Sequence, residues 1–152
     1  MKGIIETLGT GQCVFLGEAA GLNTTIGTGT NNTLLGFRSG LGITSNSGNT
    51  SVGSSSLDLG VFNEGNTSVG YQALFSHSNF NSSAAGYLAG TRMNLNSSNS
   101  IAFGSETFGS NPQVSTCIAF GYITFAKINA NINCGGFGAE ANTSGGVQTP
   151  TP

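Results

Sequence analysis

The sequence predicts an all-β protein, a parallel β-solenoid of about nine coils with a period near 17 residues. Three observations lead to it: a glycine-anchored phrase that recurs along the chain, an unusual composition, and a scarcity of charge. Of 152 residues, 25 are Gly, 19 Ser, 17 Thr and 17 Asn, and charged residues are 7% against about 25% in a typical domain. These are turn formers and poor helix formers, while 37% hydrophobic residues argue against disorder.

The repeat is clearest where Asn-Thr-Ser-Val-Gly occurs at 49–53 and again at 66–70. Its glycine is the anchor of each unit. From Gly36 onward the anchors are 17 residues apart with slips of one residue, and the two spacings before it are 10 and 9. We expect the first two units to be short, like a tapering first turn. The nine anchors are Gly17, Gly27, Gly36, Gly53, Gly70, Gly86, Gly104, Gly121 and Gly138.

Each unit has the same internal order. The residue before the anchor is apolar or small, and it shares one strand face with the residue two positions earlier. We predict that this face lines the core, thicker in the phenylalanine-rich C-terminal half. A small residue and often an apolar one follow the anchor, which predicts a second short strand and then a polar loop. The predicted core positions include Val52, Val69, Phe103, Phe120 and Phe137.

Stacking explains this composition. One 17-residue unit cannot bury its own apolar face, whereas stacked units form parallel strands about 4.8 Å apart around one core. The anchor glycine would provide a φ or a close backbone approach that a Cβ would block. Asn49 and Asn66 would hydrogen-bond along the stack as a ladder. Because each unit offers only two or three hydrophobic residues, we expect further burial between chains, most simply in a homotrimer.

The chain divides into three parts. Residues 12–142 carry the repeat, residues 1–11 form an N-terminal cap or docking segment, and residues 143–152 form an extended tail. With only four Lys and Arg and a net charge of −2, nucleic acid is not an expected partner. The sequence contains no apolar run of about 20 residues, so we do not expect membrane insertion. The N-terminal residues do not have the pattern of a secretory signal.

Residues with chemical potential are few. Cys13, Cys117 and Cys134 all precede an anchor by four residues, so the last two would stack in adjacent coils. A disulfide is possible there, but replacement of Asn by a small residue in the ladder is favoured. His77 is expected in an exposed loop, and Asp58 and Glu64 are the nearest pair of acids in the sequence. We therefore expect no catalytic residue, no cofactor and no metal site.

The phrase Asn-Thr-x-φ-Gly-x-x-Ala/Ser-Leu, at 49–57 and 66–74, resembles the head repeats of trimeric autotransporter adhesins. It is even more similar to repeats in bacteriophage and large-virus tail fibres and spikes. The resemblance covers about residues 12–142. It implies a left-handed β-roll in an intertwined or side-by-side homotrimer, with structural Asn and apolar positions and no catalytic residue. Ser100, Cys117 and Cys134 depart from the Asn that begins the motif.

The expected function is therefore non-enzymatic: a structural or receptor-binding part of a virion fibre or spike, assembled in host cytoplasm. Its partners would be two further copies, other fibre or virion proteins at the ends, and a host-surface receptor or glycan. The alternatives are an extracellular filament subunit that stacks end to end, the head of a bacterial adhesin, and a fibre enzyme. The loops expected to make contact are Thr44–Gly48, Val61–Gly65, His77–Asn81, Met93–Asn99 and Asn111–Ser115.

Overall fold

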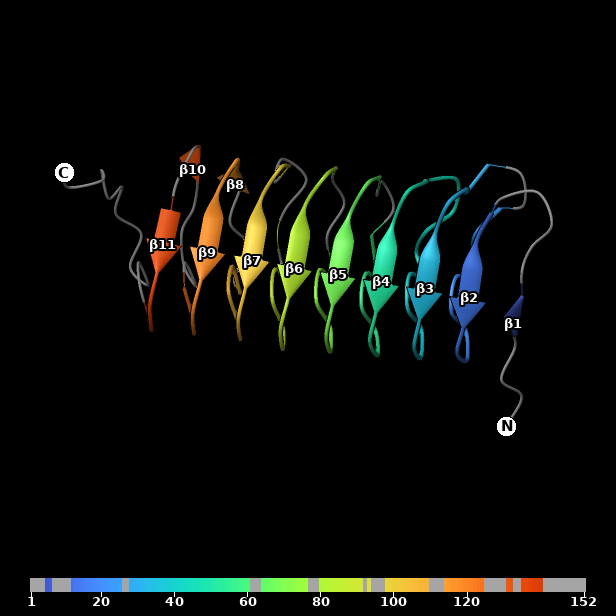
Figure 1. Ribbon diagram of the computed structural model, residues 1–152, viewed down its shortest axis with the longest axis horizontal. Helices are drawn as coiled ribbons and strands as arrows, with labels where there is room; N and C mark the ends of the chain where they lie inside the picture. The colour runs from blue at the N-terminus through green and yellow to red at the C-terminus, as the bar shows by residue number, and fades with distance from the viewer. Residues whose placement is uncertain are drawn as a thin grey trace.

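The computed structural model is a stack of short strands along one axis (Figure 1). It describes residues 5–6, 12–25, 28–60, 64–76, 80–91, 93, 98–109, 114–124, 131–132 and 135–140. Within them, one sheet has nine strands in the order β1-β2-β3-β4-β5-β6-β7-β9-β11, and β8 and β10 form a second. The strands are β1 Ile5–Glu6, β2 Val14–Leu16, β3 Thr33–Leu35, β4 Thr50–Val52, β5 Thr67–Val69, β6 Ser83–Ala85, β7 Ile101–Phe103, β8 Val114–Ser115, β9 Ile118–Phe120, β10 Asn131–Ile132 and β11 Gly135–Phe137.

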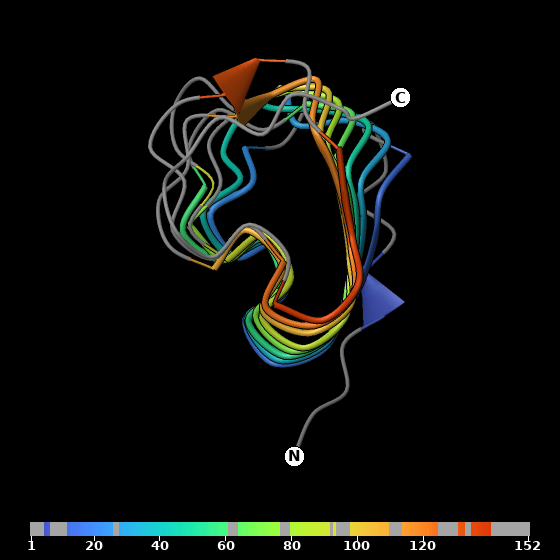
Figure 2. The same cartoon turned by 90° about the vertical axis from the view of Figure 1, so that its left-hand side faces the viewer.

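Eight strands of the large sheet, from β2 to β11, run parallel and pair in the register of the repeat, as in Thr50 with Thr67. Seen along the axis, the coils superimpose around a common outline, with the strands along one side (Figure 2). The prediction of an all-β, parallel β-solenoid is therefore confirmed. The first strand differs, because β1 pairs antiparallel with β2, placing Ile5 opposite Leu16.

The prediction of nine coils is wrong. β2 pairs directly with β3, so no strand lies between them for a unit anchored at Gly27, which itself lies outside the described residues. The first coil instead spans 19 residues, from Gly17 to Gly36. A strand register depends only on the residues that pair, so the additional length is accommodated between the strands.

The expected second strand is also wrong, because the residues after each anchor form turns. Arg38 and Gly40 both have left-handed backbone conformations, with φ of 53° and 62°, and they bend the chain around the corner. Their amides still bond between coils: Arg38 N–H donates to the Glu18 carbonyl and Gly40 N–H to that of Ser56, both at 2.9 Å. Inter-coil hydrogen bonding therefore continues around the turn without a strand, and it satisfies backbone groups that would otherwise lack a partner there.

The anchor glycines lie where neighbouring coils approach most closely. Gly53 has a φ of 136°, and a Cβ added to it would stand 2.3 Å from the carbonyl oxygen of Gly70 in the next coil. Gly36 stands in the same relation to Gly53, at 2.4 Å. No side chain fits such a gap, so the stacking distance itself requires glycine at this position.

The inward face of the strands is the opposite of the one predicted. In each three-residue strand the middle residue is buried and the outer two are more exposed, as in β3 and β5. The residues before the anchors, Val52, Val69, Phe103, Phe120 and Phe137, therefore point outward. Period-two spacing groups residues on one face without saying which face is inside, and the narrow coil places the small middle residue inward.

The interior is narrow and partly polar. Large side chains that are completely buried include Leu34, Leu57, Leu74 and Phe108, and the last three follow a buried small residue, as the sequence predicts. In the central coils the inward strand residues are Ser51 and Ser68. Ser39 Oγ donates to Ser51 Oγ at 2.8 Å, so buried hydroxyls are satisfied across the coil.

The predicted asparagine ladder is present. Asn32, Asn49 and Asn66 are completely buried. The Asn49 amide N–H donates to Asn32 Oδ1 at 2.9 Å, and the Asn66 N–H to Asn49 Oδ1 at 3.1 Å. Ser82 N–H continues the series at 2.8 Å from Asn66 Oδ1. Each side chain thus satisfies a backbone amide of the next coil, which fixes the stacking register.

Candidate functional site: the apolar outer face

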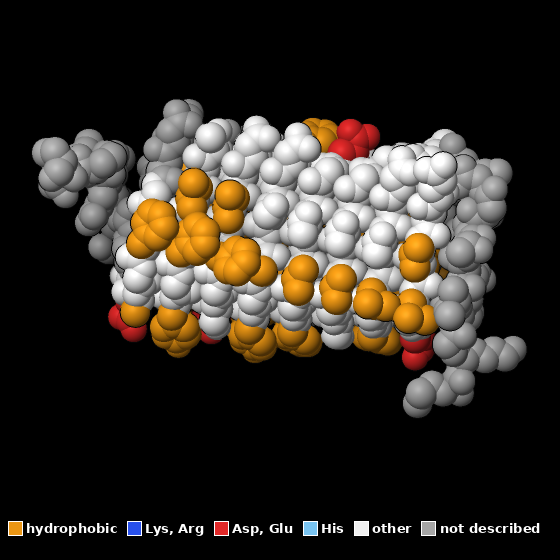
Figure 3. Space-filling model, viewed as in Figure 1, with side chains coloured by type: hydrophobic (Ala, Val, Ile, Leu, Met, Phe, Trp, Pro, Cys, Tyr) orange, Lys and Arg blue, Asp and Glu red, His pale blue; other side chains and the backbone are white. Residues whose placement is uncertain are grey.

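Hydrophobic side chains cover the outside of the strand stack in two rows (Figure 3). The outer row is the residue before each anchor, and the corner row is the residue after it. Figure 3 shows a hydrophobic band along the strand face and further hydrophobic side chains along its lower edge. The outer row comprises Leu16, Leu35, Val52, Val69, Ala85, Phe103, Phe120 and Phe137, and the hydrophobic members of the corner row are Phe37, Tyr71, Tyr87 and Tyr122.

The exposure of these rows is large for a single chain. Among the described residues, fifteen large hydrophobic side chains are exposed and seven are buried, and ten of the fifteen belong to the two rows. Phe103 is 50% exposed, Phe137 72% and Tyr87 53%. Scattered exposed hydrophobic residues are normal, but a contiguous apolar patch along a whole molecule marks an interaction surface.

Aromatic rings within the rows stack on one another because the coils repeat at the strand spacing. The ring centroids of Phe103 and Phe120 are 5.5 Å apart, and those of Phe120 and Phe137 are 5.4 Å apart with ring planes within 4°. Tyr71 and Tyr87 stack in the corner row at 5.6 Å. These contacts hold the rings in place, so a partner would meet a rigid surface at a small entropic cost.

An ion pair joins the turns that follow β3 and β4. Arg38 Nε lies 3.1 Å from Asp58 Oδ2, and Arg38 Nη2 donates to Asp58 Oδ1 at 3.2 Å. The Asp58 side chain is only 1% exposed, and the Arg38 guanidinium supplies the opposite charge that a buried carboxylate needs. Asp58 is therefore occupied structurally, while Glu64 is exposed and lies at a β-bridge to Phe80.

The cysteines divide into two kinds. Cys13 is a buried thiol whose Sγ donates to the Gly29 carbonyl at 3.3 Å and accepts from the Asn32 N–H at 3.4 Å. It therefore occupies the ladder position as a small residue, as expected. Cys117 is disulfide-bonded, so the prediction that it only replaces Asn as a small residue is wrong, and Cys134 lies outside the described residues. Parallel strands one coil apart bring such positions within bridging distance.

Other predicted features are placed only in part. His77 lies outside the described residues, as do portions of four of the five expected contact loops; only Thr44–Gly48 is described throughout. In the described part of the chain, no group of three or more His, Cys, Asp or Glu residues is arranged to hold a metal ion. A search of the same residues for a helix long and apolar enough to cross a membrane finds none.

Two features were missed from the sequence. The aromatic corner row has a visible signal, because Phe37, Tyr71 and Tyr87 each directly follow an anchor glycine. The pair Arg38 and Asp58 has no comparable signal, because its members are 20 residues apart and belong to different positions of the repeat.

Comparison of the chain with protein-family models, curated proteins and solved structures gives no match.

Proposed function

We propose that this chain is a non-enzymatic structural or receptor-binding component of a virion fibre or spike, built as a homotrimer of left-handed β-rolls. The observation that carries the proposal is the apolar outer face, whose two rows hold ten of the fifteen exposed large hydrophobic side chains of the described residues. Burial of such a surface contributes about 25 cal/mol per Å². Association with further copies supplies the stabilisation that the narrow, partly polar interior lacks.

The two rows are suited to a trimer. Each copy then offers its outer row to one neighbour and its corner row to the other, a heterologous contact that forms a ring when the rotation closes. Three parallel coils side by side are the smallest such ring. The stacked rings of Phe103, Phe120 and Phe137 form the widest part of that contact.

The repeat fits the mechanics of a fibre. Parallel strands in continuous register, joined by hydrogen bonds in the turns as well, give a stiff rod whose loops face outward. Low charge is suited to such a stack, because identical charges repeated in neighbouring coils would repel one another. Loops such as Thr44–Gly48, whose Thr44 and Ser45 are exposed, present a neutral polar surface to a receptor.

An end-to-end filament is the second candidate, and the first strand argues against it. β1 pairs antiparallel with β2 and covers the edge that a preceding parallel coil would use.

Immunogold electron microscopy tests the proposal. Antibodies against the recombinant chain are applied to purified virus particles from the source and to the surface of uninfected host cells. We expect gold on fibres or spikes of the particles. Label confined to a cell surface would support the adhesin alternative, and label on neither would reject both locations.

A further inference from the structure

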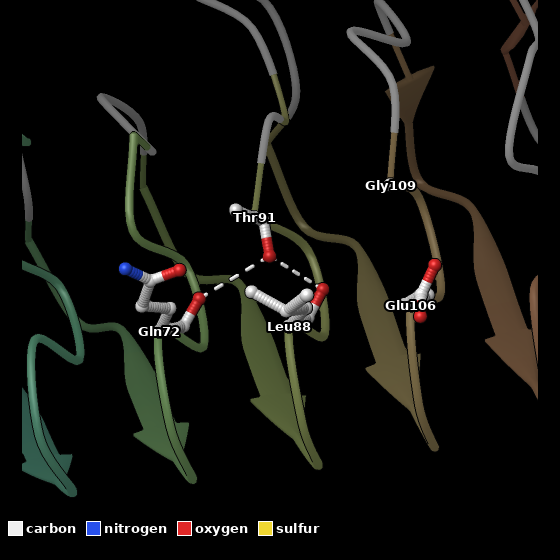
Figure 4. A pocket seen from close by; sticks show the side chains of 5 residues that line it. All are labelled: Gln72, Leu88, Thr91, Glu106 and Gly109. Carbon is white, nitrogen blue, oxygen red and sulfur yellow. Dashed lines mark hydrogen bonds between the residues drawn. The ribbon is translucent and has the colours of Figure 1, made fainter.

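The turns carry a pocket that the apolar rows do not explain. It has a volume of about 370 Å³ and is lined by Gln72, Leu88, Thr91, Glu106 and Gly109. These residues come from the three successive turns that follow β5, β6 and β7 (Figure 4). All five are half-buried rather than exposed, so they form walls of a recess instead of projections.

The pocket opens where the repeat loses its large side chains. Gln72, Leu88 and Glu106 each stand two residues after an anchor, and Thr91 and Gly109 each stand five residues after one. In earlier coils the second of these positions holds Asp58, which pairs with Arg38. The following coil has Phe75 there. Larger residues therefore occupy this repeat position after β4 and β5, and the pocket lies where Thr and Gly replace them.

The lining is rich in hydrogen-bond acceptors. Thr91 Oγ1 donates toward the carbonyl oxygens of Gln72, at 3.3 Å, and Leu88, at 2.5 Å, as Figure 4 shows. The hydroxyl hydrogen of Thr91 is therefore already used in these hydrogen bonds. Thr91 can offer a ligand only the lone pairs of its oxygen, as an acceptor. Glu106 contributes a carboxylate, and Gln72 contributes one amide with both a donor and an acceptor. A complementary ligand must supply several donors in a small space.

We propose that this pocket binds a neutral saccharide through one pyranose ring. Adjacent ring hydroxyls donate to the two oxygens of Glu106, a further hydroxyl pairs with the Gln72 amide, and a C–H face of the ring packs on Leu88. The volume of about 370 Å³ accommodates one ring and its hydration. Monovalent binding is weak, on the order of millimolar, and three copies on a trimer would raise the apparent affinity through multivalency.

The inference rests on the proposed receptor-binding role, because that role gives saccharide binding its purpose. The chemistry of the ligand is argued from the pocket alone. It is tested with the full chain by saturation-transfer NMR and isothermal titration, with neutral mono- and oligosaccharides and a sialylated oligosaccharide as probes. The sialylated probe is included because Arg92 follows Thr91 in the sequence and lies outside the described residues.

Two variants address the pocket, and one serves as control. Gly109→Phe places in the pocket the side chain that Phe75 contributes at the same register position. A Cβ at Gly109 would meet only the Glu106 carbonyl oxygen closely, at 3.1 Å. Glu106→Gln keeps the shape and removes the charge. Glu140→Gln makes the same change at the same repeat position, at an exposed residue outside the pocket.

We expect Gly109→Phe to abolish saccharide binding, Glu106→Gln to weaken it about tenfold, and Glu140→Gln to leave it unchanged. Circular dichroism and sedimentation check that each variant keeps its fold and mass. Absence of binding by any neutral saccharide at about 20 mM, retention of binding in Gly109→Phe, or preference for the sialylated probe would overturn the inference. A trimer that binds no saccharide would reject the saccharide inference and leave the proposed assembly standing. A monomer that binds a saccharide would reject the proposed assembly and leave the saccharide inference standing.

Discussion

Replacement of Gly53 by Ala tests the stacking geometry at its tightest point. The residue has a φ of 136°, and the new Cβ would stand 2.3 Å from the carbonyl oxygen of Gly70. Ordinary contact needs about 3.4 Å, so the two coils must separate locally by about 1 Å or the chain must change its conformation. Both responses disturb the amides of Gly53 and Gly70, which each donate to the preceding coil at 2.8 Å.

The cost has two parts. A side chain in a glycine-only backbone region costs about 1–3 kcal/mol, and weakening these two hydrogen bonds costs about 1 kcal/mol each. We therefore expect Gly53→Ala to lower the free energy of unfolding by about 4 kcal/mol, a large share of the 5–15 kcal/mol of a typical domain. Urea denaturation followed by circular dichroism measures it.

Gly48→Asn is the matched control. Gly48 also has a positive φ, 72°, but the nearest atom to its Cβ position is 3.7 Å away. Asn31 and Asn81 already occupy this register position with φ of 57° and 53°, so the change should cost less than about 0.5 kcal/mol. Equal stability of Gly53→Ala and Gly48→Asn would refute the argument that close approach, rather than φ alone, requires the anchor glycine.

Three further changes test other parts of the structure. Asn49→Ala should cost about 2 kcal/mol in urea denaturation, because it leaves a buried amide of the next coil unsatisfied; a neutral result would show that the ladder is not needed. Arg38→Met should cost about 2 kcal/mol by leaving the Asp58 carboxylate buried without a partner, and Arg38→Met with Asp58→Asn should recover most of that loss, so an equal loss in the double variant would contradict the pairing. Phe120→Asp in the outer row should weaken self-association at least tenfold in sedimentation experiments, while Thr44→Asp in an exposed loop should not; identical behaviour of the two would place the interface elsewhere.

The parallel stack can be predicted from the sequence because every coil has the same structural requirements at the same positions of the repeat. A Cβ is excluded at Gly53, and a side-chain acceptor is needed at Asn49, so the same residue types return at the same spacing. The ladder and the small–apolar pair after the anchor follow from this without a structure. The coil count was overestimated because the sequence alone does not show which glycines follow a strand, and β2 pairs directly with β3.

Inside and outside could not be assigned from spacing. Val52 and Val69 alternate with Ser51 and Ser68, and ordinary strands would place the valines inside. The coil is too narrow for that, so the serines face inward and satisfy one another, as Ser39 and Ser51 do at 2.8 Å. The saccharide pocket was not foreseen for a related reason, since it depends on which side chains are missing at one repeat position across three coils.

The mass of the chain in solution tests the central claim, that copies associate through the apolar outer face. Native mass spectrometry and sedimentation equilibrium of the wild-type chain measure it directly over a range of concentrations. Three copies of the 15.3 kDa chain predict a species of about 46 kDa that persists on dilution. A single species of 15.3 kDa at every concentration would contradict the account.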